Sequence, residues 1–475
     1  MMPGKPIAPA KPRTSTYNFD PSLLQARGAE LPGIESVQIS ELFPDSPVPV
    51  PTDPPEQLQA WIRDQTQRQL ARVDLSKIGP HDSVNILASH HGFTLYGGEA
   101  YAQLIRTVKD EVERRCGTQQ ISFLVGGGLR HKEPDEYIKK FALDSYFHGK
   151  AYGICPMDEG LPVETDIGTL YALKSVYTSR WIIHTHNNDI REIHYHRQLD
   201  RLIKPFSMSY ARSEMRSLYH QSMGPRSANV LARAIFNSQL VQNKFVGSVI
   251  LRVAPSGIIG VSANNDLAAQ DAEVTRFNLS WYGRIIALLR KIEDVIVVID
   301  YPGPIPYVSC GGILFGNFLN ATIDEFDLDV PCSPFNRYTD MLYPEETPLG
   351  NAKLPPANPA IKALVINYCS KGYPGTFFAQ QMPTLVVGPQ ADLLANCEEN
   401  TQFMHYALKM NSLDEAMAFA KRFAKTPNIL VFDGAMGGFN VSKPLAEKLR
   451  SLAPAVSKEV DEKLLPNWLK QRGIA

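Results

Sequence analysis

The chain has 475 residues, of which 44% are hydrophobic, and its formal net charge is −1. This length predicts two or more domains, each with its own buried core, and the near-neutral charge argues against a nucleic-acid partner. No apolar run reaches the roughly 20 residues of a membrane helix, and the first residues lack the apolar stretch of a secretory signal. The six cysteines form no CxxC pair, which favours free thiols in a reducing compartment. We therefore expect a cytoplasmic enzyme.

The domain organisation is predicted from composition and periodicity. Residues 1–55 are rich in proline and predict an extended tail or strap, because proline fixes φ and restricts the residue before it. We expect an N-terminal catalytic domain over 56–265, a C-terminal domain over 275–460 and a short tail over 461–475. The proline-rich stretch 331–360 predicts a long loop.

Short apolar runs alternate with helical patterns in both predicted domains. Helices are predicted near 55–73, over 98–115 and from about Pro134. Strands are predicted at 83–89, 121–128, 181–186, 247–255, 293–300, 363–369, 384–388 and 428–434. This alternation predicts two α/β domains with mainly parallel sheets and crossover helices. Ligands of such sheets bind beyond the carboxyl ends of the strands, here 89–92, 126–132 and 185–189.

Histidine is concentrated in one part of the chain. Ten of the 11 histidines lie between His81 and His220, and six of them form the close pairs His90/His91, His184/His186 and His194/His196. Histidine is the commonest metal ligand and titrates near neutral pH, so the concentration favours a metal or acid–base site. For any single histidine, a surface position or a hydrogen-bonded core position is the alternative.

Three glycines close the predicted strand at 121–128, namely Gly126, Gly127 and Gly128. They allow backbone amides to approach a ligand, although a tight turn is an equal alternative. The following residues do not complete a GxGxxG dinucleotide fingerprint, and the chain contains no HExxH zinc motif.

The segment 189–219 predicts a helix, a loop and a second helix. Pro205 is expected to break the first helix. Lys204 precedes it, so its side chain either reaches a pocket or is an ordinary exposed lysine. We expect truncation of Lys204 to cost little stability, within about 0.5 kcal/mol for a surface site.

The sequence IREIHYHRQLDRLIKPFSMSYARSEMRSLYH, residues 190–220, resembles the nickel-pincer lactate racemase family. His194, Lys204 and His220 match, in type and spacing, the family's acid–base histidine, cofactor-tethering lysine and nickel-ligand histidine. LVGGGLRHKEPDEYIKKF resembles the segment with the second acid–base histidine, here His131. Weaker matches are GIIGVSANNDLAAQDAE, KGYPGTFFAQQ, and SLDEAMAFA followed by NILVFDGAMGG.

The resemblance implies a cofactor and its site. The cofactor is the nickel pincer nucleotide, a pyridinium-3-thioamide-5-thiocarboxylate mononucleotide, in the cleft between two α/β domains. His91, Gly126, Gly127 and Gly128 are expected to contact it together with Lys204. We expect His131, His194, Lys204 and His220 to converge on that cleft.

The chain departs from the family at the substrate end. SHHGFT, residues 89–94, retains His91, but His90 replaces an acid and Phe93 replaces an arginine. Gln380, Gln381 and Thr384 stand where the family has other contacts. Buried amides and hydroxyls need hydrogen-bonding partners, so these residues predict a substrate other than lactate, a longer or more polar 2-hydroxy acid.

The resemblance implies an isomerase, either a racemase or an epimerase. Hydride transfer to the cofactor would be accompanied by proton transfer through two histidines, and cofactor-biosynthesis proteins would be partners. Two alternatives stay open. One is a non-catalytic or regulatory binding protein on the same scaffold, and the other is a zinc- or iron-dependent hydrolase that uses the histidine cluster.

Overall fold

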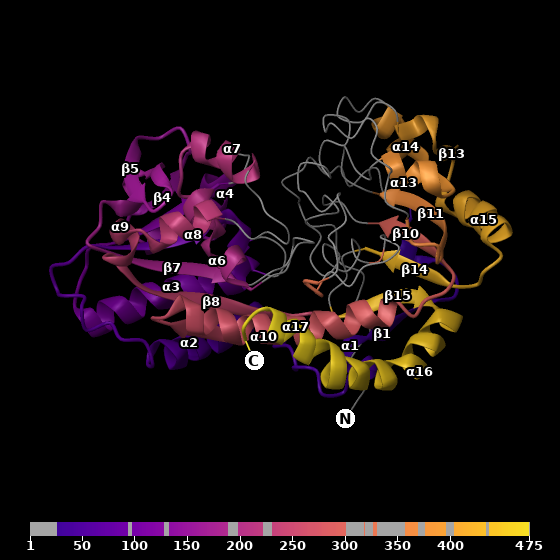
Figure 1. Ribbon diagram of the computed structural model, residues 1–475, viewed down its shortest axis with the longest axis horizontal. Coiled ribbons are helices and arrows are strands. Elements are labelled where there is room, and N and C mark those ends of the chain that lie inside the picture. The colour runs from indigo at the N-terminus through magenta and orange to yellow at the C-terminus, as the bar shows by residue number, and fades with distance from the viewer. Residues whose placement is uncertain are drawn as a thin grey trace. The chain divides into compact units, whose positions relative to one another are not determined.

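The computed structural model describes residues 26–93, 97–127, 133–188, 198–221, 230–300, 318, 326–329, 357–368, 376–395, 403–433 and 437–474 (Figure 1). The described residues of 49–276 form one compact unit, here called the first unit. Those of 26–48 and 277–474 form the second unit. None of the described helices is both long and apolar enough to cross a bilayer.

The first unit is built on a six-stranded sheet of order β4-β3-β2-β7-β8-β9 among the described residues. Its neighbouring strands are parallel except for β8 and β9, which are antiparallel. Its strands are β2 (Val84–Ser89), β3 (Ile121–Gly126), β4 (Ala151–Ile154), β7 (Trp181–Asn187), β8 (Phe245–Ala254) and β9 (Gly257–Asn264), and a separate hairpin joins β5 (Gly160–Thr165) to β6 (Gly168–Leu173).

The chain changes direction across this sheet at β2. Strands β3 and β4 are added on one side of β2, whereas β7 pairs with its other side. The boundary between β2 and β7 is therefore the topological switch point, beyond whose carboxyl ends open α/β sheets bind their ligands.

Helices cover both faces of the first sheet, with α2 and α3 on one side and α6 and α8 on the other (Figure 1). Leu202 and Phe206 of α6 and Ile235 of α8 are fully buried or nearly so in a cluster with strand residues such as Leu87 and Ile182. The helices and 3₁₀ turns of this unit are α2 (Pro55–Leu70), η3 (His90–Phe93), α3 (Gly98–Cys116), α4 (Glu133–Lys140), α5 (Leu143–Tyr146), η4 (Lys174–Tyr177), α6 (Gln198–Ser207), α7 (Ser213–Gln221), α8 (Val230–Asn237) and α9 (Gln239–Gln242).

The second unit contains a seven-stranded sheet of order β1-β15-β14-β10-β11-β12-β13 among the described residues. The pairs from β14 to β13 are parallel, while β15 is antiparallel to both β14 and β1. Its strands are β1 (Ile34–Gln38), β10 (Val295–Asp300), β11 (Ile361–Tyr368), β12 (Thr384–Val387), β13 (Leu408–Met410), β14 (Ile429–Phe432) and β15 (Gly438–Ser442). Because β11 and β14 lie on opposite sides of β10, this sheet has a switch point between β10 and β14.

The core of the second unit includes the apolar face of α15, which packs Ala416, Met417 and Ala420 against strand residues such as Val298 and Val365. Ser412 caps this helix by accepting from the Glu415 N–H. The described helices and turns are η2 (Gly28–Glu30), α1 (Ile39–Leu42), α13 (Thr376–Gln381), α14 (Gly388–Ala395), η8 (Phe403–His405), α15 (Leu413–Ala424), α16 (Lys443–Glu459), the π-helical turn η9 (Val460–Leu464) and α17 (Leu465–Gln471).

The structure confirms the predicted fold class, an α/β protein with two mainly parallel sheets and crossover helices. Two local expectations differ. Residues 34–38, predicted within a tail, form β1 at the edge of the second sheet, where they pair with β15. Helix α10 (Leu267–Leu289) begins within the stretch expected to separate the domains, and the boundary between the units falls inside it.

Candidate active site at the first switch point

Polar side chains and two glycines gather where the ends of β2 and β3 meet the segment after α6 and helix α7. We call Ser89, His90, His91, Gly126, Gly127, Ser209 and Arg216 the switch-point cluster. Strand β2 is buried along its whole length, and Ser89 ends it. The chain then turns into the short helix η3, whose first two residues are His90 and His91. The sequence thus places a hydroxyl and two imidazoles directly beyond the carboxyl end of a central strand.

Ser89 links two of these groups. Its hydroxyl oxygen lies 3.2 Å from His91 Nδ1 and 3.1 Å from the hydroxyl oxygen of Ser209. A hydroxyl donates one proton and can accept others, so Ser89 can donate to His91 while it accepts from Ser209, or the reverse. The His91 side chain is half-buried, whereas Ser89 and Ser209 are buried. This arrangement can pass a proton between a hydroxyl and an imidazole.

Gly126 permits the close approach that positions Ser209. A Cβ atom at residue 126 would lie 2.2 Å from the Ser209 carbonyl oxygen, which is part of the backbone and cannot move aside easily. The absence of a side chain therefore brings the end of β3 against the segment that follows α6. The structural role of Gly126 is this packing contact.

His90 bridges β3 and α4. Its Nδ1 donates to the Gly126 carbonyl oxygen at 3.3 Å, because a carbonyl can only accept. Its Nε2 lies 3.8 Å from Oε2 of Glu133, the first residue of α4, and both side chains are buried. Tyr137 donates to the other oxygen of Glu133. His90 therefore acts as a connector at the edge of the cluster.

Arg216 places a positive charge beside the glycine run. It comes from α7 and donates to the Gly127 carbonyl at 2.6 Å and to the Met208 carbonyl at 2.8 Å. Burial lowers the pKa of the Arg216 guanidinium to about 10, so the group stays cationic at neutral pH. The sequence analysis missed this residue. Its position four residues before His220 places both on the same side of a helix, and that spacing was the available signal.

Lys204 differs from its expected setting. Its side chain is buried, with 7% of the residue exposed, so it is not an exposed surface lysine. Pro205 does not break the helix at this point, because α6 continues to Ser207. A proline in the last turn removes one hydrogen bond without affecting the following residues, which are already leaving the helix. The expectation that Lys204 can be truncated at little cost is therefore corrected.

His184 has a structural role. It is fully buried in β7, its Nε2 donates to the Leu202 carbonyl of α6 at 2.9 Å, and the Tyr210 hydroxyl lies 3.4 Å from its Nδ1. Burial lowers the pKa of His184 to about 4, although the bond to Leu202 opposes this change. The ring is therefore neutral at physiological pH, and it holds α6, the helix that carries Lys204, against the sheet.

Asparagine side chains shape the end of β7. Asn187 Nδ2 donates to the Gly92 carbonyl oxygen at 3.5 Å. This hydrogen bond joins the end of β7 to η3. Asn188 exchanges two hydrogen bonds with the backbone of Val253 in β8. The first contact joins the two sides of the switch point, and the second joins the end of β7 to β8.

The predicted substrate contacts lie in different surroundings. Phe93 is 4% exposed and stacks on Tyr137 and Phe141, so it is a packing residue in this structure. In the second unit, Gln380 and Gln381 are exposed on α13, and Gln381 accepts from the Ala357 N–H. Thr384 is buried at the amino end of β12 and donates to the Met382 carbonyl. Gln380, Gln381 and Thr384 belong to the second unit, and their contact with the substrate stays a prediction.

Several predicted residues lie outside the described part of the chain. These are His131, His194 and Gly128, and His220 belongs to α7 without a described side chain. Their convergence with Lys204 stays a prediction. Within the described residues, no group of three or more histidine, cysteine, aspartate or glutamate side chains is arranged to hold a metal ion.

Comparisons with known proteins add little to this description. No protein-family model matches the chain, and no curated protein matches it. Among solved structures, the lactate racemase apoprotein from Thermoanaerobacterium thermosaccharolyticum is similar with a TM-score of 0.45 and 10% sequence identity, over 79% of this chain and 92% of that chain. A likeness of this degree does not establish a shared function.

Proposed function

We propose that the chain is an isomerase that racemises or epimerises a 2-hydroxy acid with the nickel pincer nucleotide as its cofactor. The observation that supports this most directly is the switch-point cluster. It combines a hydroxyl–imidazole pair that can move a proton with a buried cation that favours an anionic group nearby. A 2-hydroxy acid requires both, since it carries a hydroxyl proton and a carboxylate.

The cation is assigned to anion recognition. Arginine binds carboxylate and phosphate with paired N–H donors, and Arg216 keeps its charge in the buried cluster. We propose that Arg216 supplies the positive charge that Phe93 cannot, in contact with the substrate carboxylate or the cofactor phosphate. Gly126 and Gly127, with His91, border the same position.

The described residues fit a tethered cofactor in one respect. Lys204 is buried on a helix that His184 holds in place, so its side chain is directed into the first unit and is not free in solvent. Its amine would form the bond to the cofactor, and His220 would supply the metal ligand. When bound, the cofactor accepts and returns the hydride of the substrate carbon.

The chain's own residues would manage the protons. We propose that His131 and His194 take the hydroxyl proton from the two enantiomers, one on each side of the substrate. General acid–base help of this kind is typically worth on the order of 10²–10⁴ in rate. The Ser209–Ser89–His91 chain would orient the His91 ring beside the bound anion. The preferred substrate is a 2-hydroxy acid longer or more polar than lactate.

Intact mass and chiral chromatography test the proposal together. The chain, co-expressed with the cofactor pathway, should carry a covalent adduct and interconvert the enantiomers of a polar 2-hydroxy acid. Because Lys204 is buried, Lys204→Met is preferred to an alanine variant. It should lose adduct and turnover together, while His194→Ala should keep the adduct and lose turnover.

Four outcomes would reject part or all of this proposal. A clean mass under conditions that load a known pincer enzyme would favour a binding or regulatory protein. Zinc or iron at full occupancy would favour the hydrolase. Full nickel loading with no isomerisation in a panel of 2-hydroxy acids would reject the proposed reaction, and lactate as the best substrate would reject the proposed specificity.

A further inference from the structure

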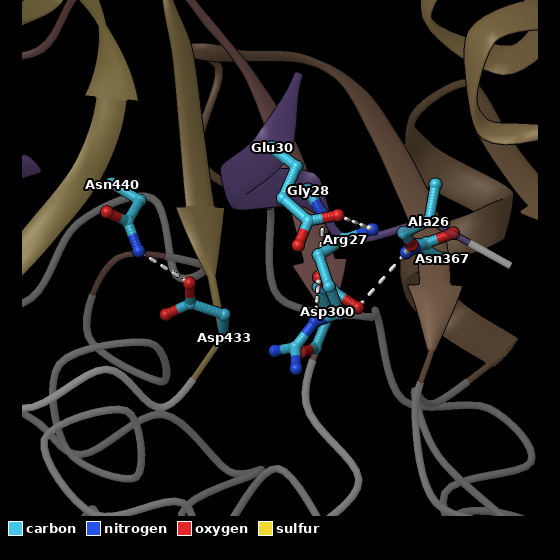
Figure 2. Close-up of polar contacts among 8 residues, drawn as sticks. All are labelled: Ala26, Arg27, Gly28, Glu30, Asp300, Asn367, Asp433 and Asn440. Atoms are coloured by element: carbon cyan, nitrogen blue, oxygen red, sulfur yellow. Dashed lines mark hydrogen bonds and ion pairs between the residues drawn. The ribbon is translucent and has the colours of Figure 1, made fainter. Parts of the chain in front are cut away.

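The second sheet has its own switch point, and polar side chains mark it. Asp300 ends β10, and Asn367 is the penultimate residue of the neighbouring strand β11. Asp433 follows β14 on the other side of β10 and accepts from Asn440 of β15 at 2.6 Å. Figure 2 shows these residues at the strand ends. We call Asp300 and Asn367 the Asp300 site.

The chain's own N-terminal segment occupies this position. The Gly28 N–H donates to Asp300 Oδ2 at 2.7 Å, and Arg27 Nε donates to the same oxygen at 2.9 Å. Asn367 Nδ2 donates to the Ala26 carbonyl at 2.7 Å and to Asp300 Oδ1 at 3.0 Å. The site therefore forms hydrogen bonds with three groups of the segment, namely a carbonyl, an amide N–H and a guanidinium (Figure 2).

Gly28 fits between the two strands that flank the switch point. A Cβ atom at residue 28 would lie 2.9 Å from Val431 Cγ1 of β14 and 3.1 Å from Val298 Cγ1 of β10. These two valines are register partners. The backbone of the segment thus lies directly over the boundary between β10 and β14, where a residue larger than glycine would require the two valine side chains to shift.

The charge of Asp300 makes the contact selective. Its side chain is completely buried, and that of Arg27 is 12% exposed. Burial raises the pKa of the Asp300 carboxyl, while Arg27, the Gly28 N–H and Asn367 oppose the change. A buried carboxylate requires a cation with matching donors. Arg27 donates to the carboxylate through Nε and to the Asp300 backbone carbonyl through Nη2 at 3.3 Å, and the point charge of lysine does not offer such a pair of directed donors.

We propose that the Asp300 site is a recognition site for a guanidinium group attached to a peptide-like amide, and that Arg27 and Gly28 fill it as a tethered ligand. An arginine-containing ligand of the same chemistry would compete with the segment and release residues 26–30 from the sheet. This inference depends on the second unit alone and is independent of the proposed isomerase.

Chemical rescue in the full chain tests the recognition. Arg27→Ala should lower the melting temperature by about 5 °C or more, because the buried carboxylate loses its cation. Millimolar methylguanidinium should restore a saturable part of that loss in Arg27→Ala and leave the parent unchanged. Arg68→Ala is the matched control, since Arg68 pairs with Asp64 on an exposed helix face. Equal effects of methylguanidinium on both variants would overturn the proposal.

Hydrogen exchange tests the competition and does not need the alanine variant to fold. In the parent, argininamide should accelerate exchange of the 26–30 amides by about tenfold or more at saturation, as expected when binding shifts the population of the open segment. Lysinamide, which has the charge without the fork, should have a much smaller effect. Arg27→Lys should show the acceleration at lower argininamide concentrations. Identical results for argininamide and lysinamide would reject the site.

Discussion

Each of the two sheets of this protein has its own switch point, and the two are used differently. At the first, between β2 and β7, the strand ends carry Ser89, His90 and His91, which contact Ser209 and β3 through hydrogen bonds. At the second, between β10 and β14, the carboxylate of Asp300 is bound by the guanidinium of Arg27 and the backbone of Gly28. The first switch point is lined by imidazole and hydroxyl groups. The second is filled by a segment of the same chain.

The difference shows that topology specifies where a site can form and that the strand-end residues decide what it does. Imidazoles titrate near neutral pH and hydroxyls can donate and accept hydrogen bonds beside them, which suits catalysis. A buried carboxylate demands a permanent cationic partner, which suits recognition. The predictions below change one side of this comparison at a time.

The largest effect is expected at the second switch point. Asp300→Ala should reduce the local stability of the second unit by about 3–5 kcal/mol, because Arg27 Nε and the Gly28 N–H would both lose the buried carboxylate oxygen to which they donate. Hydrogen exchange of the β10 amides measures this loss, with the β7 amides of the first unit as an internal reference. Asp64→Ala, which breaks an exposed pair, should change neither by more than about 0.5 kcal/mol. Equal losses in β7 and β10 would show that the change is not local.

The second prediction concerns pH and the first unit. His184 has a folded-state pKa of about 4, below the ordinary histidine value of 6.5, so the unfolded state takes up a proton first as the pH falls. The stabilisation from His184 is complete above pH 6.5 and is lost between pH 6.5 and 4. It amounts to about 3 kcal/mol as an order of magnitude.

Denaturation at pH 7 and pH 4 measures this dependence. His184→Gln should lose stability less steeply than the parent toward pH 4, because the amide does not titrate. Tyr210→Phe keeps the imidazole and should follow the parent. Parallel pH profiles for parent and His184→Gln would contradict the assignment.

Alanine substitutions at Gly126 and Gly28 compare how tightly the backbone is packed at the two switch points. Gly126→Ala should destabilise the first unit by about 1–3 kcal/mol, because the new methyl group meets the Ser209 backbone. Gly28→Ala should cost less, since the side chains of Val431 and Val298 can shift. Gly260→Ala, whose Cβ would have no neighbour within 4 Å, is the control. Urea denaturation gives the three values, and a larger cost for Gly28→Ala would reverse the proposed order.

The smallest effect is expected for Glu30→Gln. The Arg27 N–H donates to the Glu30 carboxylate at 3.4 Å in an exposed position. Water can replace such a contact, so stability should change by less than about 0.5 kcal/mol. Thermal unfolding of Glu30→Gln and Asp300→Ala, measured under the same conditions, compares the two losses of stability. A loss similar to that of Asp300→Ala would show that Glu30, and not Asp300, holds the segment.

The sequence by itself determined the fold class and most of the central strands. The predicted runs at 83–89, 121–128, 181–186, 293–300 and 428–434 overlap β2, β3, β7, β10 and β14. These strands are almost entirely buried on both faces, so their apolar character is continuous and readable without long-range information. The strand ends Ser89 to His91 were located for the same reason.

Only the tertiary structure decided which groups meet. Arg216 reaches the Gly127 carbonyl from a helix 89 residues further along the chain, and Arg27 meets Asp300 across 273 residues. Lys204 looks exposed in the sequence because polarity and a nearby proline dominate its local pattern, yet packing of α6 buries it. Residues 34–38 have no strong strand signal of their own and become β1 by pairing with β15. Such contacts depend on strand order and helix packing, which local periodicity does not encode.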